Sequence, residues 1–324
     1  MVRKYQLAVS KPGIPYYTYD EMQQDIVALQ AEYPAFMHVR SLGKSVEGRD
    51  ITEVILGDEG SKYHILIQAS MHAREYMNSI LVMNQIEDYL QEAAVRGETF
   101  CLGKEGRTDV CFHVIPMVNP DGVTLCQNIK IASQNPLVKC GMNLALGADI
   151  ITTMNQNNSD IFMEDCYLKY IRQWKANARG VDLNRNFDIG WETYTGASEP
   201  GPEGYKGSIP ASEPETQAIL NAACKYNPVC CIAYHSSGNL IYWDYGCQGE
   251  IRIRETALAT YVSDATGYPL HSTISDATDS AGCSDYFVLK LGIPAVTIEN
   301  GEKDCPLKSE EYEAIYRSNR NLWR

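Results

Sequence analysis

Short apolar runs alternate along the chain with longer segments in which apolar residues recur at helical spacing. We expect buried strands at residues 50–57, 64–70, 110–123, 228–238 and 293–301. We expect helices at residues 18–34, 77–93, 161–176, 211–226, 252–266 and 308–323. This alternation predicts an α/β fold with a mostly parallel sheet that helices cover on both faces.

Two further segments interrupt this alternation. The sequence Asn-Pro-Asp-Gly at residues 119–122 predicts a turn that ends the strand beginning at Val110. Residues 124–160 are rich in Asn, Gln and Gly, and we expect a long irregular excursion over the surface. We find no internal repeat and no linker-like boundary, so we expect one catalytic domain over residues 1–324.

Composition narrows the range of partners. The chain has 324 residues, 44% of them hydrophobic, and a net charge of −13. This acidity argues against nucleic acid as a partner. No run approaches the roughly 18 apolar residues that a membrane span needs. The N-terminus lacks the long apolar stretch of a secretory signal, so we expect a cytoplasmic protein, or a secreted one if a signal has been removed. We also expect the protein to be a monomer.

The cysteines indicate a reducing compartment. There are 11 of them, no pair has CxxC spacing, and Cys230 and Cys231 are adjacent in an apolar run. This pattern is typical of buried, reduced thiols. A few disulfides are compatible with it, for example Cys101–Cys111, whereas the spacing argues against a zinc site built from cysteines.

Three of the expected strands end in reactive side chains. Residues 64–70 lead into His72 and Glu75, the strand around residue 232 leads into His235, and the last strand leads into Glu299. In open α/β sheets the active site lies beyond the carboxyl ends of the strands. We therefore expect these side chains to meet although they are far apart in sequence.

Two histidines and one carboxylate form a pattern typical of catalytic zinc, which keeps a fourth position open. His72, Glu75 and His235 match it, and Glu299 is the candidate base that accepts a proton from water. Each residue also has a simpler interpretation. His72 would cap a helix, His235 would be a hydrogen-bonded core residue, and Glu299 would form a surface salt bridge.

Two further segments contain candidate substrate-binding residues. Asn184 and Arg185 lie in a polar turn, where an amide beside a guanidinium suits a substrate carboxylate. Alternatively, Arg185 stabilises its own loop, and this interpretation explains the segment equally well. Arg74 lies between the two candidate ligands, and it either binds a second substrate group or pairs with a local acid.

The chain resembles the zinc carboxypeptidases of the A/B type. Eight motifs carry the resemblance, in the family's order: YTYDEM, GKSVEGRDI, MHAREY, VNPDGV, GVDLNRNF, SEPET, AYHSSG and TIEN. The resemblance implies a three-layer α/β/α sandwich around a mixed, mainly parallel eight-stranded sheet. Because the match begins near residue 1, we expect no activation segment.

The resemblance also assigns roles to individual residues. It implies one zinc ion per chain, bound by His72, Glu75 and His235, with Glu299 as the general base. It further implies that three residues contact the substrate: Arg74, Asn184 and Arg185.

Two positions depart from the family's pattern. The mobile Tyr of typical members falls on Ala277 when the segment 281–287 is aligned with the family. The Arg that polarises the carbonyl follows a Trp in the animal enzymes, and here Lys175 follows Trp174. Lys175 is therefore the best positional match, with Arg172 and Arg179 as alternatives.

The segment 174–185 and the long insert after residue 123 are most similar to a bacterial branch of γ-D-glutamyl-diaminopimelate peptidases. Ser284 falls at a pocket position and is small and uncharged, which does not favour a simple Lys/Arg pocket. We therefore expect a zinc metallopeptidase that cleaves murein stem peptides. The alternatives are a general carboxypeptidase, a zinc deacylase or esterase, and a non-catalytic binder on the same fold.

Overall fold

A mixed sheet forms the centre of the protein, as seen in a computed structural model that describes residues 17–97, 109–146, 166, 168–275, 281–302 and 304–323. It has eight strands in the order β1-β2-β4-β3-β5-β8-β6-β7. Their bounds are β1 (Met37–Lys44), β2 (Asp50–Leu56), β3 (Tyr63–Ala69), β4 (Val110–Ile115), β5 (Cys230–His235), β6 (Leu240–Trp243), β7 (Leu270–Ser272) and β8 (Ala295–Glu299). The central strands β4, β3, β5 and β8 run parallel, while β1, β2 and β6 make the antiparallel pairings.

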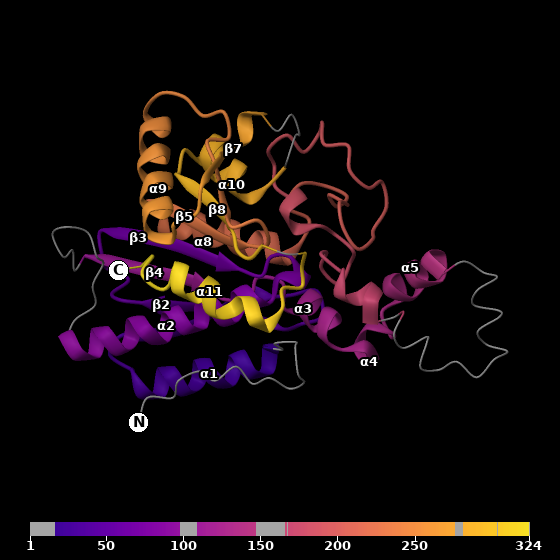
Figure 1. Cartoon of the computed structure of the whole chain (residues 1–324), viewed down its shortest axis with the longest axis horizontal. Helices are drawn as coiled ribbons and strands as arrows, with labels where there is room; N and C mark the ends of the chain where they lie inside the picture. Colours follow the sequence, from indigo (N-terminus) through magenta and orange to yellow (C-terminus); the bar gives the residue numbers. More distant parts are fainter. Residues whose placement is uncertain are drawn as a thin grey trace.

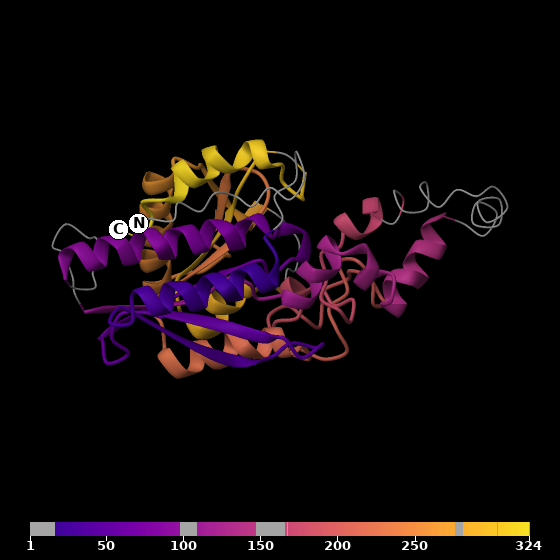
Figure 2. The same cartoon turned by 90° about the horizontal axis from the view of Figure 1, so that it is seen from below.

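Helices cover both faces of this sheet (Figures 1 and 2). One face packs against α1 (Tyr19–Glu32), α2 (Met77–Arg96), α9 (Glu250–Thr266) and α11 (Ser309–Asn319). The other face packs against α8 (Pro214–Tyr226), the short α10 (Cys283–Asp285) and the π-helical segment η4 (Tyr286–Leu291). The expected three-layer arrangement is confirmed.

The first helix shows how local sequence sets these elements. Thr18 accepts a hydrogen bond from the Glu21 amide, and the Glu21 carboxylate accepts one from the Thr18 amide, which forms a capping box. Met22, Ile26 and Leu29 recur at helical spacing and are buried. Burial of this apolar stripe holds α1 against the body of the domain.

The structure differs from expectation after β4. The segment 119–122 is the start of helix α3 (Pro120–Gln127), because the Asn119 side chain accepts a hydrogen bond from the Gly122 amide. Two more helices, α4 (Ile129–Ala132) and α5 (Pro136–Leu146), follow where we expected irregular chain. They extend away from the sheet (Figure 1). Residues 147–160 and most of 161–167 lie outside the described residues, and 168–172 are helical as expected.

The structure describes ten of the eleven cysteines. No disulfide joins the ten cysteines of the described ranges. Cys101 lies outside those ranges, so the pair Cys101–Cys111 is not tested. No helix within the described part of the chain has the length and apolar character required to cross a membrane.

One buried carboxyl group carries a stability cost. Glu255 in α9 is fully buried, and its Oε2 accepts a hydrogen bond of 2.8 Å from the Ala295 amide at the start of β8. Its Oε1 has no hydrogen-bond partner. Burial raises the pKa of Glu255 from 4.5 to about 8. The folded state therefore keeps this carboxyl protonated at pH values where the unfolded chain has released the proton.

We expect Glu255→Gln to stabilise the protein at pH 8 but not at pH 5. As pH rises from 4.5 to 8, wild-type stability falls because the unfolded chain ionises Glu255 first. Gln has no such titration and retains an acceptor for the Ala295 amide. We expect a gain on the order of 2–4 kcal/mol at pH 8, measured by urea unfolding at both pH values. Asp264→Asn, an exposed change in α9, is the control; equal effects of Glu255→Gln at both pH values would contradict the prediction.

Candidate active site

The sheet order brings the reactive strand ends together. β3, β5 and β8 are parallel neighbours, so their carboxyl ends lie at one edge of the sheet. His235 and Glu299 are directly paired residues at the ends of β5 and β8. After β3, His72 immediately precedes the 3₁₀ turn η1 (Ala73–Glu75), and Glu75 is the last residue of that turn. The expected convergence of these four residues is observed.

His72, Glu75 and His235 form a compact cluster of donor atoms. His72 Nδ1 lies 2.8 Å from Glu75 Oε1, and His235 Nδ1 lies 3.0 Å from Glu75 Oε2. The two Nδ1 atoms are 3.0 Å apart. All three side chains are buried, and their donor atoms lie within 4.8 Å of one another. The cluster could hold a metal ion.

Burial and mutual charge set the ionisation of this cluster. Burial lowers the pKa of His72, which favours the neutral imidazole that metal ligation requires. Burial alone would raise the pKa of Glu75, but His72 and His235 outweigh it and hold this pKa well below its usual range. Glu75 raises the pKa of His235 against the effect of burial. Glu75 is thus an anionic donor between two imidazoles.

Asp182 is a site residue that the sequence analysis missed. Its Oδ1 lies 3.3 Å from His72 Nε2 and its Oδ2 lies 3.6 Å from Lys175 Nζ. Burial would raise the pKa of Asp182, but Lys175 and His72 outweigh it and hold the pKa well below its usual range. A carboxylate on the far nitrogen of a ligating imidazole orients the ring. Asp182 stands two residues before Asn184 in the motif GVDLNRNF, but its spacing within the motif does not reveal its contact with His72.

The segment around Asn119 joins the parts of the site. The Asn119 side-chain amide donates hydrogen bonds of 3.1 Å to the carbonyls of Met71 and Ala176. It thereby links the chain before His72 to the chain after Lys175. A Cβ at Gly122 would lie 2.6 Å from the Ala176 carbonyl oxygen, so this close approach requires glycine. This packing explains why VNPDGV matters to the site although it contains no candidate ligand.

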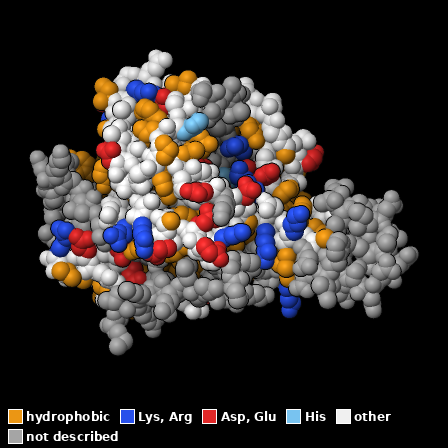
Figure 3. Space-filling view, viewed as in Figure 1, with side chains coloured by type: hydrophobic (Ala, Val, Ile, Leu, Met, Phe, Trp, Pro, Cys, Tyr) orange, Lys and Arg blue, Asp and Glu red, His pale blue; other side chains and the backbone are white. Residues whose placement is uncertain are grey.

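A cleft of about 660 Å³ opens beside the cluster. Its lining residues are His72, Lys175, Asn184, Arg185, Ile189, Gly190, Tyr242, Tyr245, Gly246, Thr273, Ile274, Ala281, Asp285, Leu289, Thr297 and Glu299. Basic and acidic side chains lie side by side around a hollow on this face of the molecule (Figure 3). The cleft is therefore a mixed-charge site with some apolar wall.

Glu299 is positioned in the cleft with a raised pKa. Burial raises its pKa to about 7, and neighbouring His235 opposes the rise. A carboxyl group with a pKa near neutrality can both accept and return a proton. Its place in the cleft beside His235 fits the expected role of a base.

Of the three cations considered for the carbonyl, Lys175 is the one in the cleft. Arg179 is exposed, and its Nη1 lies 3.6 Å from Glu213 Oε2. Arg172 is half-buried and does not line the cleft. The structure therefore favours Lys175 over both alternatives.

Asn184 and Arg185 line the cleft, and both also support their own loop. The Asn184 Oδ1 accepts a hydrogen bond of 2.8 Å from the Cys283 amide. Arg185 Nη1 donates to the Asn184 carbonyl at 2.7 Å, and its guanidinium lies over the Tyr194 ring. The two interpretations of this segment are thus compatible, because the loop contacts hold Arg185 at the cleft wall.

The remaining candidates do not line the cleft within the described residues. Arg74 Nη1 donates to the Gln173 carbonyl at 3.2 Å and lies 3.5 Å from Glu203, so it pairs with a local acid outside the cleft lining. Ser284 is buried behind the wall, and its Oγ lies 2.8 Å from Thr297 Oγ1. Ala277 lies outside the described residues.

The sequence matches the family described as "Zinc carboxypeptidase" over residues 22–310. The chain belongs to the zinc carboxypeptidase family. The gamma-D-glutamyl-L-diamino acid endopeptidase 1 of Lysinibacillus sphaericus is 29% identical over 309 residues, which cover 93% of this chain and 69% of that protein. The family resemblance noted in the sequence is thereby confirmed, and the chain is a peptidase of this family.

Solved structures support the fold. Thrombin activatable fibrinolysis inhibitor superposes with a TM-score of 0.69 at 18% identity, covering 95% of this chain and 75% of that chain. The murein-tripeptide amidase of Escherichia coli O157 superposes with a TM-score of 0.54 at 20% identity, covering 91% of this chain and 96% of that chain. The zinc carboxypeptidase fold is therefore the fold of this protein.

Proposed function

We propose that this zinc carboxypeptidase holds one zinc ion at His72, Glu75 and His235 and cleaves the γ-D-glutamyl–meso-diaminopimelate bond of murein stem peptides. The observation that carries the proposal is the buried cluster of three donors beside Glu299, at a cleft with charges of both signs. The relative from Lysinibacillus sphaericus, named as a γ-D-glutamyl-L-diamino acid endopeptidase, supports this choice of substrate.

The residues present fit zinc. Two imidazole nitrogens and a carboxylate are the donors of catalytic zinc sites, which hold these ligands at about 2.0–2.2 Å. Glu75 Oε2, which faces both imidazoles, is buried without a hydrogen bond of good geometry, and this is costly unless another partner satisfies it. When bound, zinc would act as a Lewis acid on the scissile carbonyl and lower the pKa of water in the site.

Three other side chains have separate roles in the proposed reaction. Glu299 takes a proton from the attacking water as the new C–O bond forms, and returns it to the leaving amine as the C–N bond breaks. Lys175 lies in the cleft and stabilises negative charge that develops on the carbonyl oxygen. Asp182 holds the His72 ring in position.

Several cleft residues suit diaminopimelate as the leaving group. Arg185 and Asn184 supply cationic and amide donors for its α-carboxylate. The side chain of diaminopimelate ends in an ammonium and a second carboxylate, so it needs a polar wall. Asp285, Thr273 and Thr297 provide polar groups there, with Ser284 and Arg74 supporting the surroundings of the cleft.

A general carboxypeptidase is the second candidate. Ile189, Ile274 and Leu289 line part of the cleft and would suit an ordinary apolar C-terminal side chain. A non-catalytic binder is less consistent with the site, because the three donors and Glu299 are all in place. A deacylase or esterase would share the same centre, and a panel of amide and ester substrates separates it from a peptidase.

We also propose that the chain acts as one catalytic domain and a monomer in the cytoplasm. One sheet joins strands from Met37 to Glu299, which supports a single domain. The free thiols of the described cysteines support a reducing compartment.

We expect Arg185→Ala to lower kcat/KM on L-Ala-γ-D-Glu-meso-diaminopimelate strongly, by about 10–100-fold, because the substrate carboxylate loses a charge-assisted partner. Initial rates over a substrate series measure this. Arg179→Ala is the matched control, since Arg179 is exposed and outside the cleft. An Arg185→Ala enzyme as active as the control would remove Arg185 from the substrate site.

The substrate proposal itself is tested by comparing kcat/KM values of the wild-type enzyme. We expect a higher value for the murein tripeptide than for any N-blocked dipeptide ending in Phe, Leu, Lys or Arg. A higher value for one of these dipeptides would replace the murein proposal with the general carboxypeptidase.

A further inference from the structure

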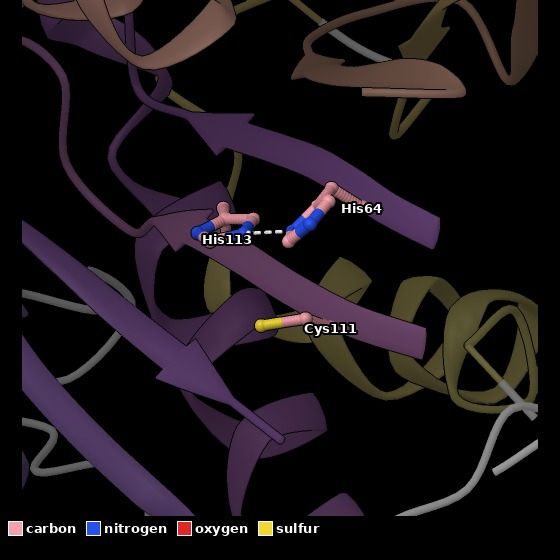
Figure 4. Close-up of side chains that lie close together, drawn as sticks. All are labelled: His64, Cys111 and His113. Atoms are coloured by element: carbon pink, nitrogen blue, oxygen red, sulfur yellow. Dashed lines mark hydrogen bonds between the residues drawn. The ribbon is translucent and has the colours of Figure 1, made fainter. Parts of the chain in front are cut away.

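A second cluster of metal-ligating side chains lies at the opposite end of the central strands. His64 begins the apolar part of β3, while Cys111 and His113 lie on β4 (Figure 4). The catalytic cluster follows the other end of β3. His64 and Ala69 are separated by five residues, which is about 17 Å along a strand. The two clusters are therefore separate sites on one sheet.

Strand register explains why these three side chains converge. His64 pairs with Cys111 across the parallel β3–β4 ladder, and His113 follows Cys111 by two residues. Residues two apart on a strand share a face, so all three project toward the same side of the sheet. Their donor atoms lie within 4.8 Å of one another, with His64 Nδ1 only 2.9 Å from His113 Nε2. This separation resembles the 3.0 Å between the Nδ1 atoms of His72 and His235 in the catalytic cluster.

A buried carboxylate orients one of the rings. His113 Nδ1 lies 2.9 Å from Glu53 Oε1, and both side chains are fully buried. The other carboxylate oxygen accepts a hydrogen bond of 3.0 Å from the Tyr226 hydroxyl and lies 3.1 Å from Arg40 Nε. With Nδ1–H donated to Glu53, His113 presents the Nε2 lone pair to the cluster. Carboxylate–histidine pairs of this kind accompany metal-ligating imidazoles.

Burial shifts the pKa values of two of these donors in opposite directions. It lowers the pKa of His64, which keeps that imidazole neutral and able to ligate. It raises the pKa of Cys111 to about 12, so Cys111 is a thiol without a metal. A hydrogen bond between the two imidazoles would explain the 2.9 Å contact, but it would explain only that contact. It gives no account of a thiol within reach of both rings, or of the carboxylate that aligns one ring.

We propose that His64, Cys111 and His113 form a second metal site, for a divalent ion of the zinc class that prefers nitrogen and sulfur ligands. Two imidazoles and one thiolate are ligands of zinc. Binding exchanges the S–H bond of Cys111 for a metal–sulfur bond and releases one proton to solvent. The ion would cross-link β3 to β4 near the ends of these strands that lie away from the cleft. The proposal does not depend on the substrate of the catalytic cleft.

Metal stoichiometry on the reduced protein tests this site directly. After equilibrium dialysis against Zn²⁺, we expect two ions per wild-type chain and one in Cys111→Ser. His235→Ala, which lacks a catalytic ligand, should also keep one. Cys231→Ser changes a buried thiol on the neighbouring strand β5 and should keep two.

Co²⁺ supplies a readout specific to the thiolate. The catalytic cluster contains no sulfur, so a thiolate-to-cobalt charge-transfer band that disappears in Cys111→Ser reports on the second cluster. We expect this band in the wild type and in His235→Ala, and its loss in Cys111→Ser and in His64→Gln. His64 is half-buried, so its replacement keeps the test informative if Cys111→Ser fails to fold. One zinc ion per folded wild-type chain, or a wild type without the band, would overturn the proposal.

Discussion

Glu299→Gln should retain zinc and substrate binding while kcat falls by about 10²–10⁴-fold, which is the usual contribution of positioned proton transfer. Gln has nearly the same shape as Glu but cannot accept a proton from water. Burial raises the pKa of Glu299 to about 7, so the wild-type group is suited to both accepting and donating a proton. Steady-state kinetics on the murein tripeptide, together with zinc analysis, measure the two effects.

Glu302→Gln is the matched control for this change. Glu302 is exposed three residues further along the chain and does not line the cleft. Its replacement should leave kcat near the wild-type value. If Glu299→Gln turned over substrate at a rate close to that of Glu302→Gln, another group would have to be the base.

His235→Ala should abolish zinc binding at the catalytic cluster and reduce hydrolysis to background. Two protein ligands hold zinc poorly, and Glu75 would lose the imidazole 3.0 Å from its Oε2. We would measure zinc by elemental analysis after dialysis, in a Cys111→Ser background, so that the ion counted belongs to this cluster. The expected result is almost no zinc retained per chain after dialysis, because only two protein ligands remain.

His38→Ala in the same background is the control, because His38 is exposed on β1. It should bind one zinc ion and retain activity. A full equivalent of zinc in His235→Ala would contradict the assignment of His235 as a ligand, whatever the activity of that variant.

The sequence predicted the site best where an apolar run is followed at once by reactive groups. The strands before His72, His235 and Glu299 are buried in the sheet, so each can be recognised in the sequence as a continuous hydrophobic run. Parallel strands bring their carboxyl ends to one edge, and this rule alone predicted that the side chains meet. Their distances and the order of the strands required the structure.

Elements with weaker hydrophobic patterns were not predicted. β1 is an edge strand that alternates irregularly between buried and exposed positions, and β6 and β7 span only four and three residues. Helix α3 was hidden because Pro120 and Gly122 usually indicate a turn, whereas here they form the first turn of a capped helix. Local sequence could not reveal the packing against Ala176 that favours the helix.

Side chains that act through other residues were the hardest to predict. Asp182 contacts His72 across 110 positions of sequence, and no local pattern marks that contact. Ser284 was expected at the pocket wall but bonds to Thr297, which occupies the wall itself. Both outcomes depend on how distant segments pack, which a pattern of apolar positions does not encode.

The most direct test of the proposed function is mass spectrometry of the products from L-Ala-γ-D-Glu-meso-diaminopimelate and the zinc-loaded protein. We predict two products, L-Ala-γ-D-Glu and free diaminopimelate, and we predict that neither forms at a comparable rate with Glu299→Gln. An intact tripeptide, under conditions in which the same preparation releases C-terminal residues from blocked dipeptides, would contradict the proposal.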